Sequence, residues 1–270
     1  MPTDSLSLPR RLRARRLSAN ISFLFAEWSF LDRFAAAADA GFTAVEFLFP
    51  YDQPADALAR RVQDNGLEVA LFNCPPGDWG GGERGIAALP GREAEFRRSV
   101  DTALIYAEVL GVRRLHVMAG LADPADPLAV ATYRRNLALA AERAERQGVR
   151  ILIEPINGQD MPGYFLRDFR TAAEIVGNGA AIGLQFDIYH CHRLHGDVLN
   201  WLDALLPVTG HIQIAGVPHR QEPAEPALPL KAILSCLDRA GYPGRVGCEY
   251  HPAEGTLAGL GWIEALEEGQ

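Results

Sequence analysis

Four side chains that carry oxygen stand at or near the ends of short apolar runs in this chain. They are Glu154 in ILIEP, Asp187 in GLQFD, Gln213 in GHIQIA and Glu249 in GCEY. Carboxylate and amide oxygens suit hard cations such as Mg²⁺ or Mn²⁺ better than zinc. Without a cation, clustered carboxylates would repel one another, and at least one would keep its proton. A rim salt bridge or a helix cap would explain any one of them alone, but the repetition favours a shared site.

A divalent cation held by such a set points to one kind of chemistry. When the carbonyl and hydroxyl oxygens of an α-hydroxycarbonyl compound bind the cation, the intervening C–H becomes acidic. Two carboxylates on opposite sides of that carbon can then remove the proton and return it. Glu154 and Glu249 close the fifth and eighth apolar runs, so we expect them to flank the ligand. The set predicts an aldose–ketose type isomerisation through an enediolate, or an epimerisation by the same proton abstraction.

Further polar residues near the same run ends fit an oxygen-rich substrate. Asn73 follows the third apolar run, His190 lies shortly after Asp187, and His219 and Arg220 follow the seventh run. A cation there would bind a substrate carboxylate, which a plain sugar lacks. We therefore predict Asn73, His190, His219 and Arg220 as substrate-binding residues.

Apolar strands and helical segments alternate along the chain. The predicted strands cover 17–23, 43–48, 68–73, 114–118, 150–154, 181–187, 210–215 and 246–250. Eight strand–helix units in about 250 residues predict a single (β/α)8 TIM barrel, an α/β fold. An open doubly wound sheet is the main rival, because it shares the alternation. In a barrel, the C-terminal strand ends face one mouth, where the side chains named above would meet.

The composition excludes several classes of partner. The chain has 270 residues, of which 48% are hydrophobic and 22% charged, and its net charge of -8 argues against a nucleic-acid surface. No apolar run approaches the roughly 20 residues that a membrane span needs. Residues 1–17 are rich in arginine and lack the apolar core of a secretory signal. We expect this segment to be a disordered or loosely docked extension, with the barrel domain at 18–270.

Cysteine and lysine usage narrows the location and the chemistry. The cysteines at 74, 191, 236 and 248 are scattered without a CxxC pair, which favours a reducing, cytoplasmic setting. The only lysine, Lys231, opens a helical segment, so Schiff-base catalysis from a strand end is excluded. The histidines at 190, 192 and 195 lack a second ligand group at a suitable spacing, which disfavours a zinc site.

Two other signals are given structural interpretations. Glu46 and His116 fall within predicted strands, and we expect hydrogen-bonded interior polar groups at both positions. The string GGGERG at 80–85 matches GxGxxG, but no helix opens at its last glycine, so no nucleotide cofactor is predicted. The longer stretch 74–93 instead predicts a loop over the barrel mouth, with Trp79 shielding the substrate.

Several long segments resemble the hydroxypyruvate isomerase family, within the xylose-isomerase-like TIM barrels and close to the 2-oxo-tetronate isomerases. The resemblance runs from Ser18 to Trp262 and includes LIEPINGQDMPGYFL, LQFDIYHCHRLHGD, GHIQIAGVPHRQEP and GCEYHP. It implies a catalytic pair at Glu154 and Glu249, with Asp187 and Gln213 as further ligands of a divalent cation. Sugar 3-epimerases of the superfamily usually have histidine at the position of Gln213, which argues against that branch.

The resemblance implies interconversion of hydroxypyruvate and 2-hydroxy-3-oxopropanoate (tartronate semialdehyde), with a small hydroxy-keto acid as the ligand and a homo-oligomer left open. The segments LHVMAG and HIQIAGVP look like 2-oxo-tetronate isomerases, so that activity is the alternative, together with a related keto-acid or sugar isomerase or epimerase. A barrel that only binds a sugar acid is a further alternative. It is motivated by AEPALP at 224–229, which replaces the family's glycine-rich, acidic turn, so that the acidic residue expected near Ala227 is absent.

Overall fold

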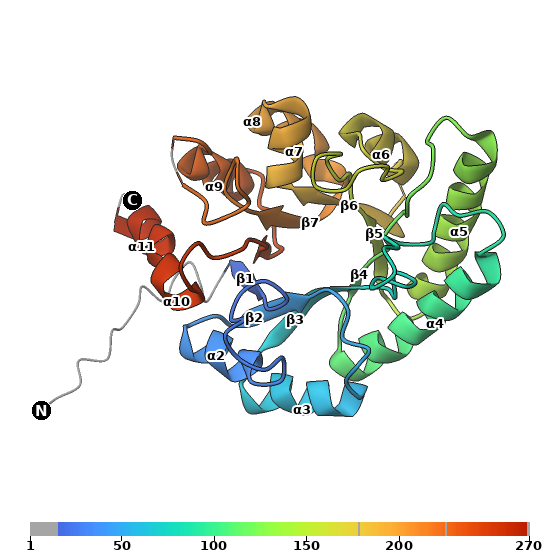
Figure 1. The fold of residues 1–270 in the computed structure, drawn as a ribbon. Helices are drawn as coiled ribbons and strands as arrows, with labels where there is room; N and C mark the ends of the chain where they lie inside the picture. Colours follow the sequence, from blue (N-terminus) through green and yellow to red (C-terminus); the bar gives the residue numbers. More distant parts are fainter. Residues whose placement is uncertain (1–15, 178, 225, 269–270) are drawn as a thin grey trace, which may run out of the picture.

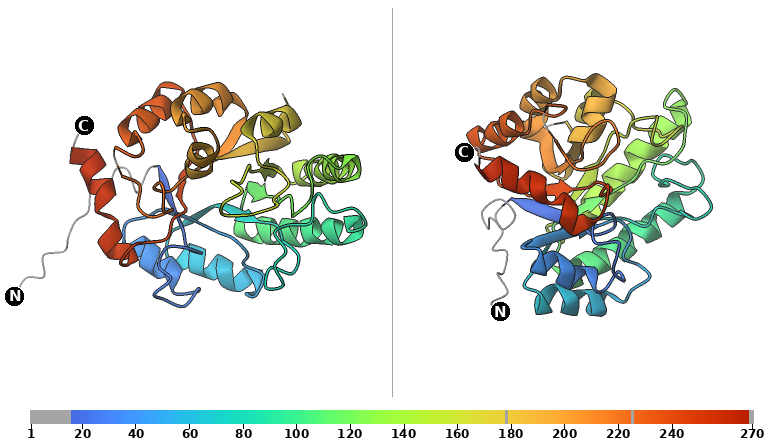
Figure 2. Two further views of the ribbon diagram at one scale, coloured as in Figure 1. Left: turned by 45° about the horizontal axis from the view of Figure 1, so that its top comes forward. Right: turned by 60° about the vertical axis from the view of Figure 1, so that its left-hand side comes forward.

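Eight parallel strands close into a barrel that is surrounded by helices (Figures 1 and 2). The computed structural model describes residues 16–177, 179–224 and 226–268. Each strand pairs with its neighbours in chain order, and β1 pairs with β8. The strands are β1 (Leu17–Asn20), β2 (Ala44–Phe47), β3 (Glu68–Asn73), β4 (Arg114–His116), β5 (Arg150–Ile153), β6 (Ile182–Asp187), β7 (Thr209–Ile214) and β8 (Val246–Cys248). The predicted (β/α)8 barrel is confirmed, and the open-sheet rival is wrong.

The helices form an outer ring, which α10 and α11 complete between α9 and α2 (Figure 1). The described helices are α2 (Arg33–Asp39), α3 (Ala55–Asp64), α4 (Glu93–Leu110), α5 (Pro127–Glu145), α6 (Phe169–Val176), α7 (Ile188–His195), α8 (Val198–Leu205), η1 (Leu206–Val208), α9 (Leu230–Arg239), α10 (Thr256–Gly259) and α11 (Gly261–Glu268). None of the helices in these described ranges is long and apolar enough to cross a membrane.

In helix α4, the apolar residues that recur in the sequence form the face that packs against the core. Phe96, Val100, Ala103 and Ala107 recur at helical spacing, and all four are buried on the inner face of α4. The helix ends at Gly111, whose φ of 68° is a left-handed conformation that glycine adopts without strain.

Several strands end earlier than predicted because the chain turns at the barrel mouth. After Asn20, the backbone N–H groups of Phe23 and Leu24 donate to the Asn20 carbonyl, so β1 stops there instead of at Phe23. Residues 1–15 of the predicted basic extension lie outside the described residues, and Leu17 already belongs to β1.

Alternate residues of each strand fill the barrel interior. On β5, Arg150 and Leu152 lie on the same side as Glu154, which follows the strand, because side chains alternate between faces. Glycines on neighbouring strands make room for them. A Cβ atom on Gly183 would lie 2.7 Å from the Arg150 guanidinium carbon, and one on Gly210 would lie 2.5 Å from a Leu152 methyl group. The interior is therefore solid, with Glu154 at the mouth and Arg150 at the floor.

Candidate active site

The ends of β5 to β8 bring the predicted catalytic and metal-binding side chains together. Glu154, Asp187, Gln213 and Glu249 are all buried, and Asp187 pairs in register with Gln213. The Gln213 amide nitrogen donates to Glu249 at 2.5 Å. Gln185 lies two residues before Asp187 on the same face of β6. Its amide nitrogen donates to Glu154 at 3.0 Å and to the Gln213 amide oxygen at 2.7 Å. Amide groups thus link the two glutamates across the mouth.

Burial and mutual repulsion raise the pKa values of these carboxylates and so favour their protonated forms. Burial, followed by the charges of Glu249 and Asp187, raises the pKa of Glu154 well above its ordinary value. Burial also raises the pKa of Asp187, and it raises the pKa of Glu249 to about 8, although Arg220 opposes both shifts. Added positive charge, such as a bound cation, would favour the ionised forms of all three.

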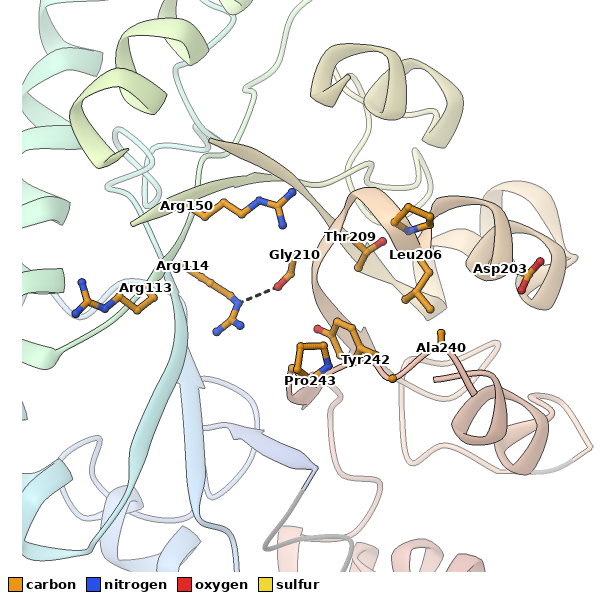
Figure 3. Close-up of a pocket in the computed structure, with 13 residues that line it drawn as sticks. Arg113, Arg114, Arg150, Asp203, Leu206, Thr209, Gly210, Ala240, Tyr242 and Pro243 are labelled. Atoms are coloured by element: carbon orange, nitrogen blue, oxygen red, sulfur yellow. Dashed lines mark hydrogen bonds between the residues drawn. The ribbon is translucent and has the colours of Figure 1, made fainter. Parts of the chain in front are cut away.

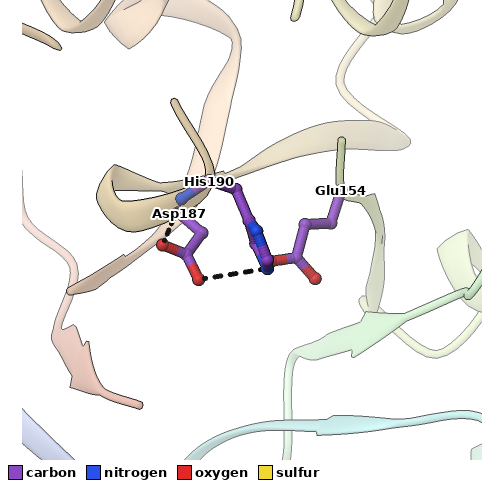
Figure 4. Close-up of side chains that lie close together, drawn as sticks. All are labelled: Glu154, Asp187 and His190. Atoms are coloured by element: carbon purple, nitrogen blue, oxygen red, sulfur yellow. Dashed lines mark hydrogen bonds and ion pairs between the residues drawn. The ribbon is translucent and has the colours of Figure 1, made fainter. Parts of the chain in front are cut away.

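Two buried carboxylate oxygens at this site have no hydrogen-bond partner among the described residues. These atoms are Glu154 Oε1 and Asp187 Oδ2, and His190 Nε2 lies between them at 3.9 Å and 3.8 Å (Figure 4). The other oxygen of Asp187 accepts from the backbone N–H groups of Tyr189 and His190 at the start of α7. Asp187 is therefore a helix cap through one oxygen and a free acceptor through the other. A hard cation suits these unpartnered oxygens.

Asn157 fixes the protonation of the His190 ring. The Asn157 side-chain oxygen accepts from the backbone N–H groups of Gln159 and Asp160, both at 3.1 Å, which turns its amide nitrogen toward His190 Nδ1 at 2.7 Å. Burial, followed by the charge of Arg220, lowers the pKa of His190 well below its usual value, so the ring is neutral. Since Nδ1 is an acceptor, the ring proton lies on Nε2 and faces the carboxylates.

One guanidinium balances part of the negative charge. Arg220 donates to Glu249 Oε1 at 2.6 Å, and it lies 3.7 Å from Asp187 Oδ2. Its guanidinium carbon is 5.4 Å from the ring centres of both Phe23 and Tyr189. Arg220 has a φ of 56°, a left-handed conformation that is rare for residues other than glycine and is concentrated at functional sites.

A cavity of about 270 Å³ opens above these groups. The predicted substrate-binding residues Asn73, His190 and Arg220 all line it. His219 does not line this cavity and is exposed, so the structure separates it from the other three predicted residues.

The glycine-rich loop predicted to cover the mouth supplies one wall of the cavity. Trp79 and Arg84 line the cavity, with the Arg84 guanidinium carbon 4.1 Å from the Trp79 ring centre. Trp79 also packs against Phe49 at 5.0 Å between ring centres. Arg84 gives the mouth a second cation, which we did not predict from the sequence.

The two interior polar residues differ from each other. Glu46 accepts hydrogen bonds from Ser18 at 2.7 Å and from His211 and Gln213 at 2.8 Å each, as expected of an interior polar group. The same expectation is wrong for His116, whose two ring nitrogens have no hydrogen-bond partner in the described chain and which lines the mouth cavity. Burial, followed by the charge of His211, lowers the pKa of His116 to about 3. His116 therefore contributes an uncharged imidazole ring to the wall of the mouth cavity.

The profile of the xylose isomerase-like TIM barrels matches residues 34–266 of this chain, which therefore belongs to that family. The chain is 53% identical to a 2-oxo-tetronate isomerase of Cupriavidus necator, over 92% of this chain and 97% of the relative. It is 41% identical to the hydroxypyruvate isomerase of Escherichia coli, over 92% of this chain and 98% of the relative. These relatives confirm the predicted family and the isomerase class.

Solved structures share the fold of this chain. A protein described as an AP endonuclease of family 2 from Brucella melitensis shares 43% identity and superposes with a TM-score of 0.90, covering 93% of this chain and 99% of the other. An L-ribulose 3-epimerase superposes with a TM-score of 0.72 at 22% identity over 93% of this chain and 86% of the other, which shows a shared fold.

Proposed function

We propose that this isomerase interconverts hydroxypyruvate and 2-hydroxy-3-oxopropanoate, with Glu154 and Glu249 as the acid–base pair. The observation that carries the proposal is the pairing of two buried carboxyl groups, both with a raised pKa, with the Arg220 guanidinium in one cavity. A carboxyl group with a raised pKa exchanges protons near neutral pH, and a guanidinium holds a substrate carboxylate. A hydroxy-keto acid offers both a proton to move and a carboxylate to bind.

The side chains divide the proton transfers between them. One glutamate, in its ionised form, takes a proton from the hydroxymethyl carbon to give the enediolate, and the other, in its protonated form, gives a proton to the neighbouring carbon. The ketone oxygen gains a proton while the hydroxyl oxygen loses one, so the atoms balance. The His190 Nε2–H faces this region and stabilises the oxygen on which negative charge develops. Arg220 and Arg84 hold the carboxylate.

A divalent cation, Mg²⁺ or Mn²⁺, belongs to the same proposal. Glu154 and Asp187 would hold it through their unpartnered oxygens, and Gln213 and Glu249 would complete the ligand set. When bound, such a cation polarises the substrate carbonyl and acidifies the adjacent C–H. His190 Nε2 lies in the same cluster as these two oxygens, and in the tautomer that Asn157 favours it would carry a proton and act as a donor beside the cation, not as a ligand.

A 2-oxo-tetronate is the second candidate substrate. The observation that favours it is the higher identity to the Cupriavidus necator relative, 53% against 41% for the Escherichia coli hydroxypyruvate isomerase. The same two-carbon unit would react, and one additional carbon would occupy the cavity of about 270 Å³.

The buried thiols support the expected cytoplasmic location. All four cysteines are free and buried. Burial raises the pKa of both Cys74 and Cys191 to about 12, so these thiols stay protonated. They take no part as nucleophiles in the proposed reaction.

The test is a coupled assay with purified enzyme, in which a tartronate semialdehyde reductase consumes the product. Parallel reactions with 2-oxo-tetronates rank the substrates by kcat/KM. Glu154→Gln and Glu249→Gln should each reduce kcat about 10²- to 10⁴-fold, the usual contribution of a general acid or base. Glu142→Gln on the outer face of α5 is the matched control and should keep full activity. Wild-type rates in both active-site variants would sink the assignment.

A further inference from the structure

A second cavity, of about 460 Å³, opens at the opposite end of the barrel (Figure 3). It is lined by the first residues of β4, β5 and β7 and by the turn at 240–244 before β8. Here it is called the floor cavity. It is larger than the cavity of about 270 Å³ at the mouth, and the two share no lining residue.

Three arginines line the floor cavity: Arg113, Arg114 and Arg150. None of them forms an ion pair within the part of the chain that the structure describes. Arg114 and Arg150 extend into the same space, facing Thr209 and Tyr242, whereas Arg113 points away at the rim (Figure 3). The one carboxylate in the lining, Asp203, is exposed and lies on α8 at the far side (Figure 3). The cavity therefore has an unbalanced positive charge.

Backbone carbonyls hold the two inner guanidiniums in place. Arg114 Nε donates to the Gly210 carbonyl at 2.8 Å, and an Arg150 terminal nitrogen donates to the carbonyls of Ile182 at 3.1 Å and Val208 at 3.4 Å. Neither terminal nitrogen of Arg114 has a partner among residues 16–177, 179–224 and 226–268. Donors that are fixed in position but unused suit a ligand with several oxygens.

The barrel is shaped around Arg150. A Cβ atom on Gly183 would lie 2.7 Å from the guanidinium carbon, and one on Gly210 would lie 3.3 Å from a terminal nitrogen. Burial, followed by the charge of Arg114, lowers the pKa of Arg150. Two guanidiniums that repel each other are thus packed into a fixed arrangement, and a bound anion would relieve the repulsion.

We propose that the floor cavity binds a small organic oxyanion, a phosphate ester or a polycarboxylate. Arg114 and Arg150 would hold the anionic group through bidentate hydrogen bonds, the geometry that guanidinium forks favour. The apolar wall formed by Leu206, Pro207, Tyr242 and Pro243 would cover the carbon skeleton. This site is independent of the proposed isomerase reaction, because Leu152 fills the interior between Arg150 and Glu154.

The experiment is isothermal titration calorimetry of the full chain at low ionic strength with inorganic pyrophosphate and, separately, with citrate. We expect saturable binding of at least one probe, and the stronger of the two identifies the phosphate or the carboxylate class. Arg114→Gln should weaken binding about tenfold, as expected when one charge-assisted hydrogen bond is lost. Arg114→Lys, which keeps the charge but not the fork, should lie between the two. Arg135→Gln on the outer face of α5 should bind as the wild type does.

Thermal denaturation of each variant checks that it is folded, and Arg220→Gln tests which end of the barrel binds. The proposal is overturned if neither probe binds saturably, or if folded Arg114→Gln binds as tightly as the wild type. It is also overturned if Arg220→Gln abolishes binding, because the probe would then occupy the mouth. The binding results with wild-type protein and the Arg114 variants do not depend on isomerase activity, so the two proposals can be refuted separately.

Discussion

The two ends of the barrel hold their charges by different means. At the mouth, carboxylates from β5 to β8 share hydrogen bonds with the amides of Gln185 and Gln213 and with Arg220. At the floor, Arg114 and Arg150 are tied to backbone carbonyls, and no described carboxylate pairs with them. At the mouth, side-chain partners alter the pKa values of the carboxylates. At the floor, neutral backbone carbonyls fix the positions of the guanidiniums without neutralising their charge. The mouth is thus built for proton transfer and the floor for holding an anion.

Among the variants that compare the two ends of the barrel, the largest effect should come from removing the Arg220 guanidinium at the mouth. Arg220→Gln should reduce kcat/KM about 100-fold, since truncating one partner of a buried charge pair costs roughly 3 kcal/mol. Steady-state kinetics on hydroxypyruvate would measure the loss, with Arg135→Gln as the control. A rise in KM at constant kcat would mean that Arg220 acts in binding alone. An unchanged kcat/KM would show that the Arg220 guanidinium has no role in the reaction, and it would weaken the contrast between the two ends of the barrel.

At the floor, we expect the space between side chains to determine which substitutions the fold tolerates. In Gly210→Ala, the added methyl group would lie 2.5 Å from a Leu152 methyl group. We expect a loss of about 1–3 kcal/mol in the free energy of unfolding, typical of overpacking. Urea denaturation would measure it. The control is Gly261→Ala, which has no neighbour within 4 Å and should stay within about 0.5 kcal/mol of the wild type. Equal stability of the two variants would contradict the tight packing of Arg150 and Leu152.

The tautomer of His190 tests whether hydrogen bonds set protonation at the mouth. In Asn157→Asp, a carboxylate would face Nδ1 and draw the ring proton to that nitrogen. We expect kcat to fall about tenfold, as is usual when a supporting hydrogen bond is replaced. The ¹⁵N chemical shifts of the His190 ring would show a protonated Nε2 in the wild type and a protonated Nδ1 in the variant. A wild-type ring already protonated on Nδ1 would refute the role given to Asn157.

The free energy of unfolding should also depend on pH, because of the carboxylates at the mouth. The pKa of Glu249 is about 8 in the folded chain and lies near 4.5 without the fold, so the folded state binds the proton more tightly. With chelator present, the free energy of unfolding and the Tm should therefore fall as the pH rises from about 4.5 through 8. Mg²⁺ or Mn²⁺, which favours the ionised carboxylates, should restore more of that loss at the higher pH.

Thermal scans at the two ends of this pH range, with and without cation, would measure the effect. Glu249→Gln is the matched variant, because it removes this titration and should reduce the pH dependence to the part that comes from Glu154 and Asp187. If the wild type and Glu249→Gln respond equally to pH in chelator, the raised pKa is wrong. If the cation stabilises neither, the mouth does not hold it.

Apolar runs were enough to predict the barrel, since parallel strands that are buried on both faces read as continuous hydrophobic stretches. Once the barrel was expected, strand order placed Glu154, Asp187, Gln213 and Glu249 at one mouth. Helix α7 was not predicted, because its histidines and arginine break the apolar periodicity, and it forms because Asp187 caps it.

The missed residues depend on contacts between distant parts of the chain. Asn157 matters because its amide nitrogen reaches His190, 33 positions away. Arg114 and Arg150 begin strands, where a charged residue ordinarily faces solvent. Only closure of the barrel turns both of them inward to the same cavity. The prediction for His116 failed because no polar group of the described chain lies within hydrogen-bonding distance of its ring nitrogens; Glu154 Oε2 is 3.7 Å from Nε2.

The glycines opposite β5 also constrain how this sequence can change over evolutionary time. A larger residue at 210 needs a smaller one at 152, and a larger residue at 183 needs a different side chain at 150. Single substitutions at these positions are therefore penalised, while matched pairs are tolerated. We expect the residues at positions 150, 152, 183 and 210, which lie on three neighbouring strands, to covary among homologous sequences.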